Sequence, residues 1–90
     1  MDKTKNEKFA QFITTSGKAN GGDHTRYKFE NGRGASVING GIYARGLELA
    51  VLDSFDELDY STPITDDVIG YLDDAGLEST LEAISKLPSE

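Results

Sequence analysis

Hydrophobic and polar side chains alternate along the stretch His24–Glu30. Tyr27 and Phe29 fall on one face, and charged residues fall on the other. Alternation with a period of two is typical of a β-strand that buries one face. The pair Asn31-Gly32 follows, and both residues tolerate the positive φ of a tight hairpin turn. We therefore predict a strand that ends in a hairpin at this pair.

The pattern continues as an antiparallel meander up to residue 62. A short apolar run, "ASVI", predicts the returning strand, and the triplet Asn39-Gly40-Gly41 predicts the next corner. The stretch "IYARGLELAVLDS" alternates again, with Gly46 as the expected position of a bulge. "LDYST" predicts a short last strand. The expected sheet thus spans residues 25–62 and has three or four strands.

After Pro63 the spacing of apolar residues changes to that of helices, over residues 65–87. Thr65 is a good N-cap, and two aspartates follow it in what would be the first turn. Val68, Tyr71 and Leu72 would then share one helix face. The stretch "DDAG" separates this helix from a second one, whose apolar stripe recurs at Leu77, Leu81, Ile84 and Leu87.

The N-terminal part is expected to contribute less. Phe9, Phe12 and Ile13 could form one helical turn docked on the sheet, and residues 14–24 have the composition of a loop. Residues 1–7 are expected to be disordered. The predicted fold class is α+β: an antiparallel three- to four-stranded meander followed by two C-terminal helices packed on one face. One edge of this sheet is expected to be exposed, where pairing could generate a homodimer.

Size and composition fit a single small domain over residues 1–90. The chain has 37% hydrophobic and 28% charged residues. Without cysteine there is no disulfide and no thiolate metal site, as is common in a reducing cytoplasm. The N-terminus lacks the apolar core of a signal peptide, and no stretch reaches the length of a membrane span. We expect neither export nor membrane insertion.

Charge is distributed unevenly along the chain. The formal net charge is -7, but residues 1–33 hold seven Lys/Arg and four Asp/Glu, a net of +3, whereas residues 34–90 hold two and twelve, a net of -10. The acidic part would repel a nucleic-acid backbone. It is either a solvated surface that keeps a small protein soluble or a binding surface for a basic partner.

The sequence does not match the motifs for catalysis or cofactor binding that we compared it with. "NGRGAS" fits neither a P-loop nor a dinucleotide fingerprint. The lone His24, without cysteine, excludes a Cys-His or Ser-His-Asp centre and a zinc site. "DSFDELD" lacks the glycine and terminal glutamate of an EF-hand, which leaves only weak cation binding open. The four tyrosines either complete the core or expose hydroxyls for contacts. We expect no enzyme, cofactor or metal site.

Three segments carry a resemblance. "YKFENGRGASVI", "LELAVLD" and "LDYSTPITDDVIGYL", within Arg26–Leu72, resemble a recurrent group of short, mostly uncharacterised bacteriophage-encoded proteins. Here Arg33 stands where such proteins often carry an aromatic residue. The group has no assigned catalytic residues. The resemblance implies a phage origin, a site of action in the host cytoplasm and a host-takeover or counter-defence role, such as that of an anti-CRISPR protein.

Two hypotheses follow from charge, size and resemblance. The first is an acidic inhibitor that binds a host or defence protein with a basic surface, such as a CRISPR or restriction effector, as a nucleic-acid mimic. The alternative is a non-enzymatic phage accessory or assembly protein whose acidic face only confers solubility. Neither binds nucleic acid or a membrane directly. The candidate partner-binding residues are Asp53, Asp56, Glu57, Asp59, Asp66, Asp67, Asp73 and Asp74.

Overall fold

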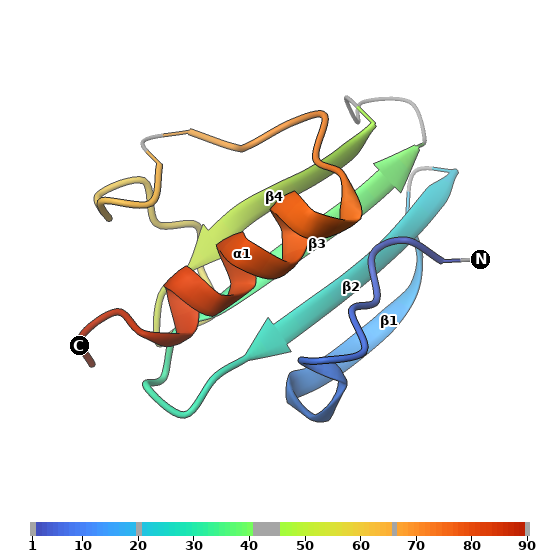
Figure 1. Cartoon of the computed structure of the whole chain (residues 1–90). Coiled ribbons are helices and arrows are strands. Elements are labelled where there is room, and N and C mark those ends of the chain that lie inside the picture. The colour runs from blue at the N-terminus through green and yellow to red at the C-terminus, as the bar shows by residue number, and fades with distance from the viewer. Residues whose placement is uncertain (1, 20, 41–45, 66, 90) are drawn as a thin grey trace.

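Four β-strands form one antiparallel sheet in the order β1-β2-β3-β4, and one helix packs on a single face of it (Figure 1). The computed structural model describes residues 2–19, 21–40, 46–65 and 67–89. The elements are a short 3₁₀ helix (Ala10–Phe12), β1 (Ile13–Ala19), β2 (Gly22–Lys28), β3 (Gly34–Gly40), β4 (Leu47–Leu52) and α1 (Asp74–Ser85). The predicted α+β meander is confirmed, with four strands and one C-terminal helix.

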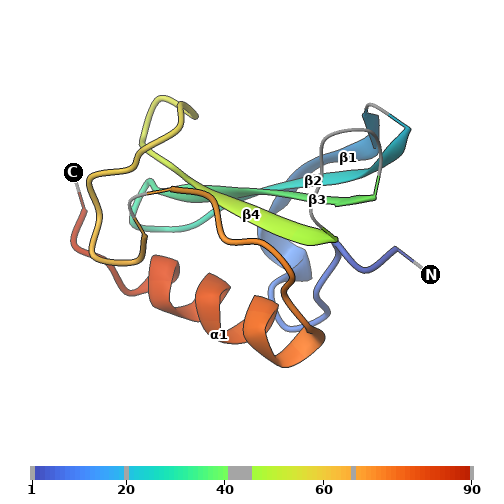
Figure 2. The ribbon, with the colours of Figure 1, turned by 90° about the horizontal axis from the view of Figure 1, so that it is seen from above.

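The core lies between α1 and the sheet. Alternate residues of β2 and its continuation, Thr25, Tyr27 and Phe29, are buried on the helix side, as the sequence pattern predicted. The helix contributes Leu77, Leu81 and Ile84, whose spacing of four and three places them on one face. The opposite face of the sheet has no covering layer of helices (Figure 2).

The first of the two predicted helices is wrong. Residues 67–72 run beside β4 instead. Leu49 and Ile69 exchange backbone hydrogen bonds of 2.8 and 2.9 Å, and the Leu72 N–H donates to the Leu47 carbonyl at 2.9 Å. These contacts occupy the edge of β4, which would otherwise lack partners. A long-range pairing of backbone groups therefore overrides the local helix signal.

The helix that is present, α1, begins within the stretch "DDAG", which we predicted to separate two helices. The Asp73 carboxylate accepts a hydrogen bond of 2.6 Å from the Gly76 N–H, so Asp73 is the N-cap. The "DDAG" stretch is thus a cap and a first turn. The second predicted helix is confirmed with the apolar stripe Leu77, Leu81 and Ile84, but it ends at Ser85, so Leu87 lies beyond it.

Three predictions about the sheet are also wrong. Of residues 14–24, which we predicted as loop, residues 14–19 belong to β1 and residues 22–24 begin β2, with which β1 pairs along its length. The strand predicted near residue 60 is reduced to one isolated bridge between Leu52 and Leu58. Gly46 has a φ of +66° and lies just before β4 rather than at a bulge within it. The predicted start of that strand and part of its preceding corner, residues 41–45, lie outside the described residues.

The N-terminal segment, for which we predicted disorder over residues 1–7, is anchored on the sheet over residues 2–7. Thr4 is fully buried, and its hydroxyl lies 2.6 Å from that of Thr25 in β2. The Tyr27 hydroxyl donates to the Thr4 carbonyl at 2.5 Å and accepts from the Asn6 N–H at 2.9 Å. One buried phenol thus fixes two successive parts of the segment on the sheet. Met1 lies outside the described residues.

The predicted hairpin at Asn31-Gly32 is present, with a loop one residue longer than expected. Phe29 donates to the Arg33 carbonyl at 2.8 Å, and Gly32 donates to the Phe29 carbonyl at 3.0 Å. Only Gly32 of the pair has a positive φ, +88°. Asn31 instead uses its side chain, whose Nδ2 donates to the carbonyls of Ile84 and Leu87 at the end of α1.

We predict that Gly32→Ala lowers the free energy of unfolding by about 1 kcal/mol, because a side chain is strained at this φ. No crowding adds to the cost, since an added Cβ would meet only the Ser54 Cβ, at 3.8 Å. Gly17→Ala is the matched control, because its Cβ would enter open space at an ordinary φ. Urea denaturation of both variants measures the difference. Equal stability of the two variants would contradict the turn geometry.

We predict that Tyr27→Phe lowers the free energy of unfolding by about 1–3 kcal/mol, because it leaves the Thr4 carbonyl and the Asn6 N–H without their partner. Amide exchange at Asn6 should accelerate in parallel. Tyr71→Phe removes a hydroxyl from an exposed ring and serves as the control. An unchanged exchange rate at Asn6 would show that the phenol does not hold the segment.

Candidate protein-binding surface

Exposed apolar side chains interrupt the acidic stretch that follows β4. In residues 53–61, here named the 53–61 loop, Phe55 is 81% exposed, Leu58 56% and Tyr60 41%. Carboxylates flank each of them in the sequence. Isolated exposed apolar residues are ordinary on protein surfaces, but three within six positions of one loop are unusual enough to make this loop a candidate contact surface.

The start of this loop is held by hydrogen bonds of its own backbone. The Asp53 carboxylate accepts from the N–H groups of Phe55 and Glu57 at 2.8 and 3.0 Å. The Asp53 N–H in turn donates to the Glu57 carbonyl at 2.8 Å. Asp56 adopts a φ of +60°, which aspartate tolerates better than most residues. Phe55 is therefore presented on a closed turn and not on a free segment.

Two cations tie the loop to the body of the protein. Lys28 Nζ donates to the Ser54 carbonyl at 3.0 Å and contacts the Asp56 carboxylate at 3.3 Å. Arg33 Nη1 donates to the Asp59 carboxylate at 3.1 Å, and its Nε donates to the Pro88 carbonyl at 3.3 Å. The loop is thereby connected to β2, to the β2–β3 hairpin and to the segment after α1. In Figure 2 its first part rises on the side of the sheet opposite α1.

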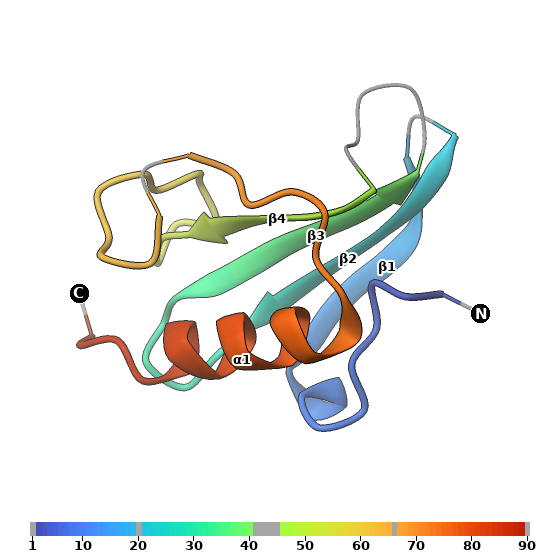
Figure 3. The same cartoon turned by 45° about the horizontal axis from the view of Figure 1, so that its top comes forward.

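The structure gathers four of the eight predicted partner-binding residues and separates others. Those in the 53–61 loop lie at the end of the sheet where α1 also ends. Asp73 and Asp74 lie at the start of α1, one helix length away, about 18 Å for twelve residues (Figure 3). Asp67 lies in the segment beside β4, and Asp66 lies outside the described residues. The gathered residues are Asp53, Asp56, Glu57 and Asp59.

Part of the uneven charge is matched inside the molecule. Among the described residues, three ion pairs join the basic first third to the acidic remainder: Lys8–Glu82, Lys28–Asp56 and Arg33–Asp59, at 3.3, 3.3 and 3.1 Å. The Asp53 carboxylate accepts hydrogen bonds from the loop backbone, and the Asp73 carboxylate caps the N-terminus of α1. Within the described residues Glu57 makes no ion pair. It is thus the loop carboxylate that is free for an external cation.

The pKa of Asp59 is lowered from its ordinary value. The largest cause is the Ser61 hydroxyl, which donates to the carboxylate at 2.5 Å, and the Ser61 N–H adds a second bond at 2.9 Å. The Arg33 guanidinium contributes further. These three contacts hold Asp59 in its ionised form and fix the second half of the loop.

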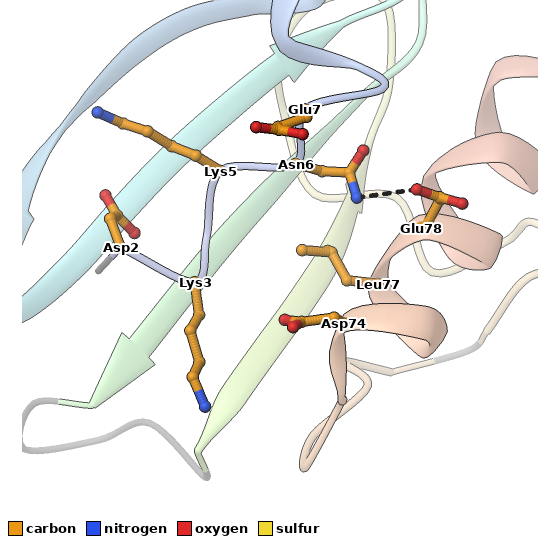
Figure 4. A pocket seen from close by; sticks show the side chains of 8 residues that line it. All are labelled: Asp2, Lys3, Lys5, Asn6, Glu7, Asp74, Leu77 and Glu78. Carbon is orange, nitrogen blue, oxygen red and sulfur yellow. Dashed lines mark hydrogen bonds between the residues drawn. The ribbon is translucent and has the colours of Figure 1, made fainter.

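A hollow of about 270 Å³ lies between the N-terminal segment and the start of α1 (Figure 4). The Asn6 amide donates to the Glu78 carboxylate at 3.4 Å across it. Charges of both signs line it, so its chemistry singles out no class of ligand. The lining residues are Asp2, Lys3, Lys5, Asn6, Glu7, Asp74, Leu77 and Glu78.

The other residues considered for chemistry have ordinary surroundings. His24 Nε2 lies 3.1 Å from the Ser36 hydroxyl, and burial together with the Arg26 charge lowers its pKa. No three His, Asp or Glu side chains of the described residues are grouped to hold a metal ion. Of the tyrosines, Tyr27 is core, Tyr60 and Tyr71 are exposed, and Tyr43 lies outside the described residues. Among the described helices, none is long and apolar enough to span a membrane.

Comparisons of the chain with protein-family models, with curated proteins and with solved structures found no match. The 53–61 loop is therefore the candidate site on geometric grounds alone. The sequence analysis identified its carboxylates but missed the exposure of Phe55 and Leu58. The available signal was the succession "SFDELDY", in which apolar and acidic residues alternate within a turn instead of a buried strand.

We predict that the stability contributed by Asp59 is lost in acid. A carboxylate with a lowered folded-state pKa stabilises the fold above its unfolded pKa, near 3.8, and loses this effect as the pH falls through the lower folded value. The wild type should lose more unfolding free energy than Asp59→Asn below about pH 4. Urea denaturation across this range measures it. Parallel pH profiles would contradict the assignment.

Proposed function

We propose that this protein is a small, non-enzymatic, phage-encoded inhibitor that binds a host or defence protein through the 53–61 loop. The resemblance of Arg26–Leu72 to short phage proteins supports the origin. The partner class is a protein with a basic surface, such as a CRISPR or restriction effector whose nucleic-acid site would be occupied. The observation that carries the proposal is the exposure of Phe55 on a closed, acidic turn.

Aromatic side chains are the usual anchors of protein interfaces, since they bury a large area at little cost in side-chain entropy. Phe55 is 81% exposed, so almost all of its ring is available to a partner. The Asp53 hydrogen bonds hold its backbone before binding, which reduces the entropy lost on association. Leu58 and Tyr60 extend the same apolar contact.

Carboxylates around the anchor would select a basic partner. Glu57 has no cation among the described residues, whereas Asp56 and Asp59 are paired with Lys28 and Arg33. The net charge of -7 adds a long-range attraction to a basic surface, which speeds encounter. In this arrangement the apolar residues supply affinity, and the charges supply orientation and association rate.

The internal ion pairs favour the second candidate, a phage accessory or assembly protein. Lys8–Glu82, Lys28–Asp56 and Arg33–Asp59 use acidic residues to hold the fold together. In such a protein the remaining carboxylates would confer solubility, and Phe55 would contact another phage protein. The two candidates differ in the source of the partner and in the dependence of binding on charge.

We predict that a tagged wild-type protein captures a specific partner from host lysate and that Phe55→Ala weakens this binding about tenfold or more. Glu57→Lys should slow association and reduce its dependence on salt. Captured proteins are identified by mass spectrometry, and affinity and rates are then measured with the purified partner.

Tyr71→Ala is the matched control, because Tyr71 is 79% exposed but lies outside the 53–61 loop, at the segment that leads into α1. It should bind like the wild type. Unchanged affinity of Phe55→Ala would remove the loop as the contact site. A partner found only among phage proteins, with binding insensitive to salt, would support the accessory protein instead.

A further inference from the structure

The two edges of the sheet differ in their surroundings. The edge of β4 is paired with residues 67–72 through Leu47 and Leu49. The edge of β1 has no such neighbour: within the described residues, no backbone hydrogen bond beyond the β1–β2 ladder involves Thr14–Lys18. An edge strand presents a row of unpaired N–H and C=O groups to any extended chain that approaches it.

β1 carries few of the features by which edge strands avoid association. It is seven residues long, contains no proline, and is exposed from Thr14 to Lys18. The only irregularity of its pairing lies at the start, between Ile13 and Thr15. Lys18 is its single charged residue, and Asp23 of β2 neutralises that charge in an ion pair. The outer part of the strand is thus regular, polar and close to neutral.

We infer that β1 pairs with β1 of a second copy, antiparallel about Ser16, so that two sheets join into one of eight strands. Pairing about the middle of the strand is isologous and closes a twofold dimer. It places Lys18 opposite Thr14 of the other copy, so like charges do not face each other. The shared ladder extends over about 24 Å for seven residues.

Charge favours a second copy on this edge over any other edge of the molecule. Two chains of net charge -7 repel each other, and their carboxylates are concentrated after residue 46, beside β4 and on α1. β1 lies at the opposite side of the sheet from β4 (Figure 1). A β1–β1 dimer therefore holds the acidic parts of the two copies as far apart as the sheet allows.

The dimer leaves the proposed contact site free. The 53–61 loop follows β4, so both loops lie at the outer strands of the joined sheet. Two identical loops on one rigid body could engage two sites on a symmetric partner, which raises avidity without any new contact. The inference does not depend on the proposed function, since it concerns only the edge of β1.

The test is the oligomeric state of the purified full chain, measured by sedimentation equilibrium over a range of concentrations. An edge pairing of this size is weak, so the dimer should form only as the protein concentration rises. The measured mass of the wild type should then approach twice that of the monomer. Ser16→Lys and Ser16→Glu should each be monomeric, since like charges then meet at the twofold axis. An equimolar mixture of the two variants should recover the dimer mass as a heterodimer.

Ser79→Lys is the control, because it adds the same charge at an exposed position of α1 and should dimerise like the wild type. Amide hydrogen exchange tests the same pairing without a mutation. The backbone N–H groups of Thr14–Lys18 should exchange more slowly as the concentration of the wild type rises. A wild type that stays monomeric, or a dimer that survives in Ser16→Lys, would overturn the inference. Phe55→Ala should leave the dimer intact, so a failure of the loop proposal is distinguishable from a failure here.

Discussion

A single helix is narrower than the sheet it covers, and the rest of the structure depends on this mismatch. Four strands at about 4.8 Å spacing are wider than one helix of about 10 Å diameter. α1 covers the side of β3 and β4, and the N-terminal segment covers the side of β1 and β2 (Figure 1). Phe9 is buried there, with its ring 5.8 Å from that of Phe29. Tyr27 completes the arrangement because its hydroxyl reaches the backbone of the covering segment.

The uneven distribution of charge along the sequence helps to hold the fold together through ion pairs. The basic first third of the chain supplies the cations that hold acidic elements in place. Lys8 pairs with Glu82 of α1, and Lys28 and Arg33 pair with Asp56 and Asp59 of the 53–61 loop. Exposed ion pairs of this kind contribute little individually, but Arg33 and Asp59 are mostly shielded from solvent and join three parts of the fold. The carboxylates that are free of internal ion pairs are therefore fewer than the net charge of -7 suggests.

The elements that could be predicted from the sequence are those in which apolar residues recur with the period of a buried face. β2, β3, β4 and the apolar stripe of α1 each alternate or recur with their own period, and all were found. β1 was not, because an edge strand that is exposed from Thr14 to Lys18 leaves no apolar period to detect. The helix that we predicted from Thr65, a good local N-cap, does not form. The backbone contacts of Ile69 with Leu49 and of Leu72 with Leu47, twenty or more residues away, decide against it. Half of the site was predictable for the same reason: acidic residues are visible in a sequence, whereas the exposure of Phe55 follows from tertiary structure.

The two covering layers of the sheet come from opposite ends of the described chain, and this affects the order of events during synthesis. Residues 2–12 leave the ribosome first and α1 leaves last, after all four strands. Until α1 emerges, the apolar face of β3 and β4 has no cover, and the Asn31 amide lacks the helix carbonyls that it binds. The nascent chain therefore cannot complete its core stepwise. The fold is therefore complete only after α1 has been synthesised, and the nascent chain exposes an apolar surface until then.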